Sequence, residues 1–286
     1  MRSWGLICIC LFSAALAGAD SISGSGIVLK TDTGGGTVTV SCDAVPGVAD
    51  AKVKTFRVRD RLNVASLHPG DNISFAILSS GHEALIDKIE VHPFVAVEND
   101  PSQARRMRII AKGPKGLLQV VRAGQEFPDF TLVDQQSQRV RLQEFRGKVV
   151  AISFMYTRCA LPNFCYRLSN NLGRLQNRFR QRLGRDLVLL TITFDPVHDR
   201  PEQLALYAKN WKADPKGWHF LTGTEQAIRE VCDRADVDYY TDEGLLSHSL
   251  HTLVIDREGK LVTNLEGNNF SEQQLGDLVQ VVLEQK

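Results

Sequence analysis

The sequence predicts two folded units, a small all-β barrel followed by a layered α/β domain. After residue 24, short runs with period-two alternation are separated by turn signals such as Gly34-Gly35-Gly36 and Pro69-Gly70-Asp71, which is typical of a small closed barrel. Beyond residue 122, strand-like runs alternate with stretches of helical periodicity, which is typical of a sheet covered by helices.

We therefore divide the chain into four parts. We expect a signal peptide, a barrel, a linker in which proline, glycine and basic residues recur, and an α/β domain, over residues 1–19, 24–92, 93–121 and 122–286. The barrel strands are expected at 26–32, 37–41, 54–60, 72–78 and 84–91.

In the α/β domain, strands are expected at 149–156, 187–194, 251–256 and 260–267, and helices near 168–183, 201–211, 224–235 and 271–284. The first helix carries an apolar stripe at helical spacing, which indicates core residues: Leu172, Leu175, Phe179 and Leu183. Gly184 is expected to end that helix.

Composition excludes one class of partner. The 286 residues carry a formal net charge of +1, with both signs interspersed, so no global field attracts nucleic acid.

The N-terminus has the layout of a secretory signal, with Met1-Arg2, an apolar run over 4–17 and small residues at 15–19. The run is shorter than the roughly 20 residues of a spanning helix, so we expect cleavage and an exported, periplasmic protein. An uncleaved membrane anchor is the alternative. Cys8 and Cys10 would leave with the signal, and the mature cysteines would be Cys42, Cys159, Cys165 and Cys232.

Cys159 and Cys165 lie at a strand-to-helix turn. Backbone N–H groups and the helix dipole at such a turn stabilise thiolate, the form that attacks disulfides and binds metal. Pro162-Asn163 between them favours a turn that brings the sulfurs together. A structural disulfide would fit the same spacing. Two thiolates suit Cu(I) or Zn(II), for which an imidazole is the usual further donor.

Four ordered segments, 124–159, 191–208, 218–224 and 248–261, resemble the Sco/SenC family of thioredoxin-fold copper proteins, over residues 122–286. The resemblance implies a thioredoxin-like fold and a copper ion bound by two cysteines and one histidine. It also implies copper delivery to the binuclear centre of cytochrome oxidase.

Carried over to this sequence, the resemblance makes Cys159 and Cys165 the redox-active pair, and those two residues with His248 the metal ligands. The family spacing puts three residues between the cysteines, whereas this chain has five. Asp195 and Asp199 of the DPxxD segment are expected to support the site.

The expected α/β domain has four histidines and one further cysteine, Cys232. His251 competes with His248 as third ligand because it precedes residues 252–256 of the expected strand, where thioredoxins place a cis-proline that faces the cysteines; we favour His248. His198 and His219 are left unassigned. Cys232 continues an apolar helical pattern and is expected to pack in the core.

Residues 24–92 resemble the periplasmic copper-binding barrels of the CusF type, which implies an OB-like barrel. At the family's ligand positions this sequence has Cys42, Lys52 and Lys54, and ammonium groups do not bind soft metals. We expect this barrel to have lost metal binding and consider that it docks a partner.

The leading hypothesis is a copper metallochaperone whose partner is the copper-centre subunit of cytochrome oxidase or another exported copper or thiol protein. Membrane contact is expected only through a partner or an uncleaved signal. If the protein is an enzyme, the alternative is a thiol-disulfide oxidoreductase in which Cys159 attacks and Cys165 resolves. A peroxiredoxin is disfavoured because residues 153–158 lack its pattern, and a purely structural module is the remaining alternative.

Overall fold

The computed structural model describes residues 22–44, 51–79, 84–92, 119–159, 162–242 and 245–285. The expected signal segment and residues 93–118 of the expected linker lie outside these ranges. Among the described residues, no helix has the length and apolar character needed to cross a bilayer.

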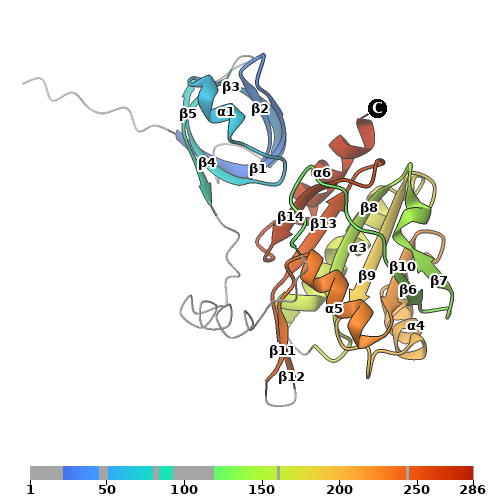
Figure 1. Ribbon diagram of the computed structural model, residues 1–286. Helices are drawn as coiled ribbons and strands as arrows, with labels where there is room; N and C mark the ends of the chain where they lie inside the picture. The colour runs from blue at the N-terminus through green and yellow to red at the C-terminus, as the bar shows by residue number, and fades with distance from the viewer. Residues whose placement is uncertain are drawn as a thin grey trace, which may run out of the picture.

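The N-terminal unit is a closed five-stranded barrel, which confirms the predicted all-β class (Figure 1). Its strands, in the order β1-β2-β3-β5-β4, are β1 (Ile22–Asp32), β2 (Thr37–Cys42), β3 (Lys52–Val58), β4 (Asn72–Ser79) and β5 (Leu85–His92). Val38 and Val40 of β2 are buried, as the alternation requires, and Phe56 packs on Phe75 with ring centroids 5.0 Å apart. A short helix that we did not predict, α1 (Arg61–Ala65), begins where Asp60 caps the Leu62 N–H.

The C-terminal unit is a seven-stranded sheet in the order β14-β13-β8-β9-β10-β6-β7, which confirms the α/β class. The strands are β6 (Thr131–Asp134), β7 (Arg139–Arg141), β8 (Val149–Met155), β9 (Leu187–Thr193), β10 (Trp218–Thr222), β13 (His251–Ile255) and β14 (Leu261–Glu266). The central strands β8, β9 and β10 pair in parallel, and every residue of β8 and β9 is buried.

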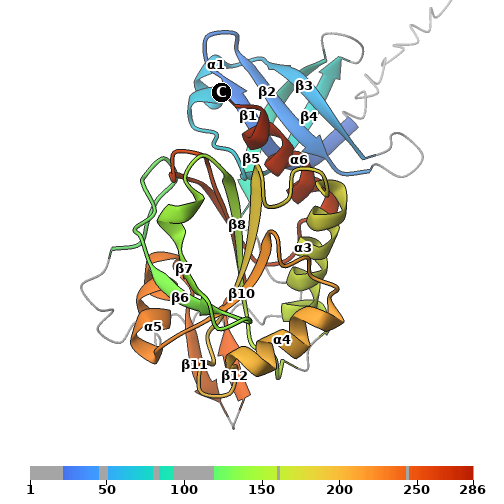
Figure 2. The ribbon, with the colours of Figure 1, turned by 90° about the vertical axis from the view of Figure 1, so that its right-hand side faces the viewer.

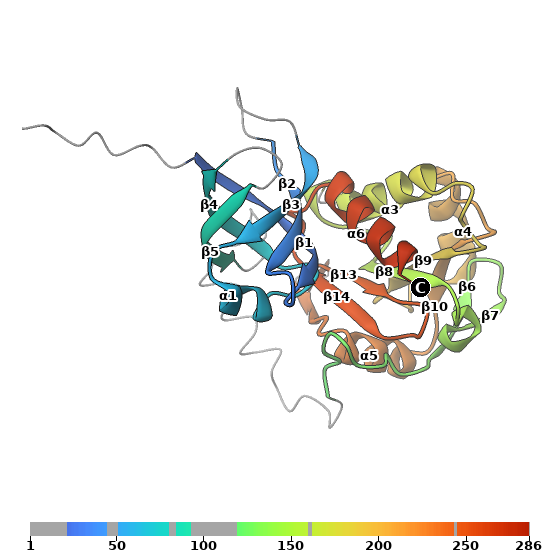
Figure 3. The ribbon, with the colours of Figure 1, turned by 90° about the horizontal axis from the view of Figure 1, so that it is seen from above.

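Helices cover both faces of this sheet, with α3 and α6 on one face and α5 on the other (Figure 3). The helices are α3 (Arg167–Arg178), α4 (Pro201–Asn210), α5 (Glu225–Arg234) and α6 (Glu272–Glu284). A separate two-stranded hairpin, β11 (Tyr239–Asp242) with β12 (Leu245–His248), extends from the domain beside α5 (Figure 1). We did not predict β6, β7, β10 or this hairpin as strands.

The first helix is shorter than predicted, ending at Arg178 rather than near residue 183. The chain turns at Phe179, so Gly184 does not end the helix. Gly184 has φ +76°, and a Cβ there would lie 2.4 Å from the Lys216 carbonyl oxygen. Glycine is therefore needed for a close backbone approach after the helix.

The barrel packs on the α/β domain through β1, β2 and α6 (Figure 2). At this contact the buried Ser41 hydroxyl donates to Asp277 Oδ2 at 2.7 Å, and Arg178 donates to Asp277 Oδ1 at 2.7 Å. The barrel residues Ile27 and Leu29 belong to the same apolar core as the sheet. The two units therefore share a packed interface.

Candidate metal centre

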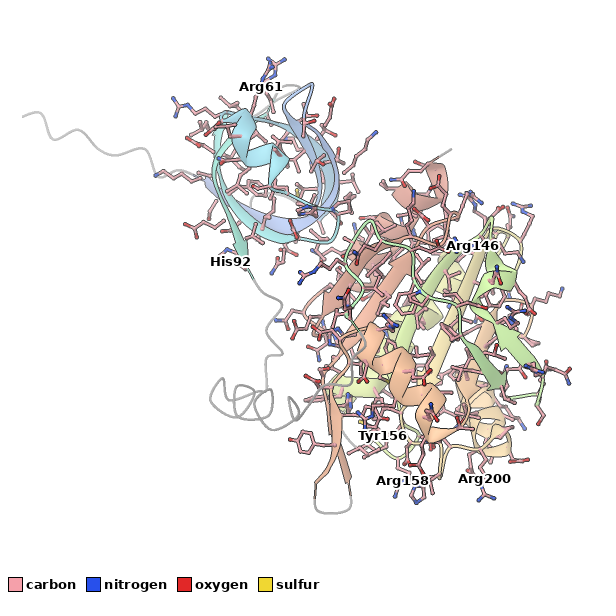
Figure 4. The ribbon with its side chains drawn as sticks, viewed as in Figure 1. Arg61, His92, Arg146, Tyr156, Arg158 and Arg200 are labelled. Carbon is pink, nitrogen blue, oxygen red and sulfur yellow. The ribbon has the colours of Figure 1, made fainter. Side chains whose placement is uncertain are left out.

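The first candidate ligand, Cys159, lies in the turn that follows strand β8. The apolar residues of this strand run through the core to Met155, and the chain then turns through Tyr156 to the half-buried Cys159, whose N–H donates to the Tyr156 carbonyl at 3.2 Å. Figure 4 shows Tyr156 and Arg158 at the end of the domain farthest from the barrel. The site thus lies at the carboxyl end of a central parallel strand.

Cys165 lies in a single π-helical turn, η2 (Pro162–Tyr166), that leads into α3. Phe164, just before it, has φ −106° and ψ −112°, so the turn is irregular there. Cys165 is 1% exposed. The chain therefore reaches the buried sulfur position through an irregular turn before the regular helix begins.

His248 comes from the opposite direction, at the end of β12. Its Nε2 lies 3.5 Å from the Cys165 sulfur, and its Nδ1 lies 2.9 Å from the Ser249 carbonyl oxygen. A carbonyl oxygen only accepts, so Nδ1 carries the proton and Nε2 presents its lone pair to the sulfur. The Ser249 carbonyl thus selects the tautomer that can bind a metal through Nε2.

The sulfurs of Cys159 and Cys165 and an imidazole nitrogen of His248 all lie within 4.8 Å of one another. Neither sulfur is in a disulfide. The five-residue spacing therefore still brings the two sulfurs together. Two sulfurs and one imidazole form a soft donor set, which fits Cu(I).

Three aromatic rings pack around the half-buried imidazole of His248. The ring centroids of Tyr156, Phe164 and Phe194 lie 5.8, 6.2 and 4.5 Å from that of His248. An apolar surround limits solvent access to a metal bound there.

Burial, and next the contact with the Cys159 sulfur, raise the pKa of Cys165 well above its usual value. We expected the helix end to favour thiolate here, and for Cys165 that expectation is wrong, because desolvation of a buried charge outweighs the nearby N–H donors. Without metal, the Cys165 thiol donates to His248 Nε2. Metal binding must displace this proton.

Two buried carboxylates support the loop that carries Cys159. Asp199 is fully buried; its Oδ2 accepts from the Thr157 N–H at 2.9 Å and the Thr193 hydroxyl at 2.5 Å, and its Oδ1 accepts from the Thr157 hydroxyl. Asp195 accepts from Arg158 Nη2 at 2.8 Å. Both aspartates therefore support the site without lying in the ligand group, as expected.

A histidine also contacts Asp195, since His198 Nδ1–H donates to it at 2.8 Å. Burial works to raise the pKa of Asp195, but the hydrogen bonds from His198 and Arg158 outweigh it and lower that pKa. Asp195 is therefore an ionised partner for Arg158, the residue before Cys159.

The other candidate residues lie outside the ligand group. His251 is 2% exposed, its Nδ1–H donates to Asn264 Oδ1 at 2.9 Å, and burial lowers its pKa. His219 contacts Asp134 at 3.3 Å. Cys232 lies in the core as predicted, and burial raises its pKa.

In the barrel, Cys42 lies opposite Lys52 across the β2–β3 ladder, and the Lys54 ammonium lies 5.4 Å from the centroid of the Phe56 ring. Burial raises the pKa of Cys42 to about 11. A cation over the ring and a protonated thiol are both unfavourable for binding a metal cation.

The sequence analysis did not predict the aromatic rings around His248, nor the contacts of Tyr239 and Arg229 beyond them. Phe194 stacks on Tyr239, and Arg229 lies over the Tyr239 ring. Phe194 immediately precedes Asp195 in the DPxxD segment, so its position next to a supporting motif was a usable signal. Nothing in the local sequence marks Tyr239 or Arg229.

Comparison with known proteins identifies both units. Residues 121–283 match the family described as SCO1/SenC, and residues 21–91 match the family described as copper binding periplasmic protein CusF. Both family resemblances predicted from the sequence are thus confirmed, and copper is confirmed as the metal of these families.

Among curated relatives, the chain is 28% identical to protein sco1 of Schizosaccharomyces pombe over 50% of this chain and 56% of that protein. It is 33% identical to a SCO2-like protein of Rickettsia typhi over 46% of this chain and 66% of that protein. The chain thus spans less than two thirds of the length of either relative.

Among solved structures, a SCO1/SenC family lipoprotein from Bacillus anthracis is similar, with a TM-score of 0.51 and 22% identity over 58% of this chain and all of that one. A second structure, of BsSco, has a TM-score of 0.50 and 22% identity over 59% of this chain and 99% of that one. These likenesses confirm the thioredoxin-like fold.

Proposed function

The chain belongs to the SCO1/SenC family, and on that premise we propose that it is an exported copper metallochaperone that holds one copper ion on Cys159, Cys165 and His248. The observation that carries the proposal is the convergence of two sulfurs and one imidazole nitrogen within 4.8 Å. Copper is here the cargo.

The ligands and the residues around them have different roles when copper binds. Both cysteines bind as thiolates, so any thiol proton on Cys159 and the proton on Cys165 leave to solvent, while the Nε2 of His248 binds through its lone pair. The Asp199 and Asp195 contacts hold the Cys159 loop, and the surrounding rings exclude water. Release proceeds by ligand exchange, in which donors of the acceptor replace these three in turn.

We propose the copper centre of cytochrome oxidase as the acceptor and the periplasm as the location. The solved structure of BsSco is described as that of a member of a family of cytochrome c oxidase assembly proteins, and the CusF family is described as periplasmic. The apolar N-terminal run, with its small residues at 15–19, supports export as well.

We propose that the barrel contributes no copper ligand, because Lys52 and Lys54 occupy two of the positions where CusF-type barrels bind metal. Cys42, which holds the third, is the last residue of β2 in the barrel, whereas Tyr156 and Arg158, on the turn that leads to Cys159, lie at the end of the α/β domain farthest from the barrel (Figure 4). A Cys42→Ser variant should therefore keep a stoichiometry of one copper.

One observation favours a second candidate function, dithiol exchange with an exported protein. The Cys159 and Cys165 sulfurs contact each other, so little movement would be needed for them to form a disulfide. In this reaction the Cys159 thiolate attacks a partner disulfide, and Cys165 then displaces the partner, which leaves reduced. His248 would not be required.

The deciding experiment measures copper stoichiometry and affinity of the reduced mature protein by competition with a calibrated Cu(I) chelator. Cys159→Ser, Cys165→Ser and His248→Ala are compared with the control Cys42→Ser. We expect one tightly bound copper in the parent and the control, and its loss or strong weakening in the other three. Absence of copper binding with intact disulfide exchange would favour the oxidoreductase.

A further inference from the structure

The third ligand of the proposed site lies on an element that is separate from the main sheet. His248 ends β12, which among the described residues pairs with β11 alone, in a two-stranded sheet. The turns that carry both cysteines instead begin or end on the central sheet and α3. The distance between the imidazole and the sulfurs therefore depends on whatever holds the hairpin.

A column of side chains joins this hairpin to the domain. Phe194, 2% exposed and directly after β9, packs on His248 with ring centroids 4.5 Å apart and stacks on Tyr239 at 5.4 Å and 25°. Tyr239 is also the residue directly opposite His248 in the hairpin ladder. Phe194 thus contacts both members of one cross-strand pair.

This column of side chains ends at the guanidinium group of Arg229. The Arg229 guanidinium carbon lies 3.7 Å from the centroid of the Tyr239 ring, which is close contact for a cation over an aromatic face. Arg229 is on α5, whose neighbouring residues Ile228 and Cys232 are fully buried. The guanidinium is therefore held by a helix anchored in the core.

We propose that Arg229 is a positioning residue for the third copper ligand, acting on His248 through Tyr239 and Phe194. The Arg229 cation holds the Tyr239 ring against Phe194. This contact fixes the position of the hairpin, so that the Nε2 of His248 faces the cysteine sulfurs. This inference rests on the proposed function, because it assigns Arg229 a role at the same site.

The test is a double-mutant cycle on the full mature chain. Copper affinity is measured by chelator competition for the parent, Arg229→Ala, His248→Ala and the double variant. Arg229→Ala should weaken copper binding about five-fold in the parent and add no further weakening to the reduced binding that remains in His248→Ala, because coupled residues are non-additive. Arg229→Lys, which keeps a cation for the ring, should restore most of the affinity.

The matched control is Arg234→Ala on the same helix, whose guanidinium donates to the Gln119 carbonyl instead. It removes an equal charge and should leave copper affinity unchanged. Equal weakening by Arg229→Ala with and without His248, or by Arg234→Ala, would overturn the proposal.

A second readout uses the metal-free reduced protein and does not depend on copper. Arg229→Ala should speed amide hydrogen exchange in β11 and β12 and shift the imidazole resonances of His248, whereas Arg234→Ala should do neither. If His248→Ala leaves copper binding intact, the proposed site fails, but faster exchange in Arg229→Ala would still support the positioning role. Unchanged exchange and unchanged imidazole shifts would refute it.

Discussion

Replacing Asp199 measures how much the Cys159 loop depends on one buried carboxylate. Asp199→Ala removes the acceptor of the Thr157 N–H and of two threonine hydroxyls. The hydroxyls can rotate, but the part-buried Thr157 N–H loses its acceptor, and this loss together with the lost charge-assisted bonds costs up to about 3 kcal/mol. We expect the free energy of unfolding to fall by about 3 kcal/mol.

For a domain of this size, that loss corresponds to a Tm lower by roughly 6–12 °C. Copper affinity should fall by about ten-fold or more, as is typical when a group that orients a metal ligand is removed. The assays are denaturant unfolding of the reduced protein and chelator competition for copper. Asp199→Asn, which keeps one acceptor, should show a smaller loss in both.

The control is Asp186→Ala, which removes a carboxylate paired with Arg182 and Arg185 at the surface, away from the Cys159 loop. Exposed pairs contribute about 0–1 kcal/mol, so this variant should be nearly as stable as the parent. If Asp199→Ala unfolded like Asp186→Ala and bound copper normally, the loop would not depend on Asp199 and the reasoning would be refuted.

Three further predictions follow from charges and contacts in the structure. Because burial raises the pKa of Cys165, its thiol is protonated at neutral pH. Copper loading should therefore release a proton that is measurable in weak buffer, and copper affinity should rise with pH. Loading without proton release would contradict this. The lowered pKa of Asp195 means that its ion pair stabilises the fold above the unfolded pKa of about 3.9 and loses this effect as pH falls through the folded pKa. The difference in unfolding free energy between the parent and Asp195→Asn should therefore be present at pH 7 and vanish in acid, and a constant difference would count against the pairing with Arg158. Asp277→Ala should destabilise the contact between the barrel and the α/β domain by about 2 kcal/mol, because it leaves the buried Ser41 hydroxyl without its acceptor. Separate unfolding transitions of the two units should then appear. A single unchanged transition would argue against this contact.

The sequence by itself determined the five barrel strands and, in the α/β domain, the strands β8, β9, β13 and β14 and the presence of the four helices. Period-two alternation placed all five barrel strands, and helical periodicity placed α4, α5 and α6 to within a few residues, because these patterns reflect which side chains face a core. Short strands such as β7 (Arg139–Arg141), and the hairpin strands β11 and β12, have too few residues to show a period and were missed.

The cysteine pair was also identifiable from sequence, because a buried strand followed by an amphipathic helix places Cys159 and Cys165 at their junction. The choice between His248 and His251 depended on tertiary structure. The two are three residues apart, but the turn after β12 directs His248 toward the sulfurs and leaves His251 buried against Asn264.

Tertiary structure alone decided the electrostatics and the supports of the site. Burial raises the pKa of Cys165, opposite to the local expectation for a helix end, because desolvation depends on the whole surrounding core. The column from Arg229 through Tyr239 to Phe194 joins residues that are distant in sequence. Such contacts arise only when separate elements pack, so no local pattern in the chain encodes them.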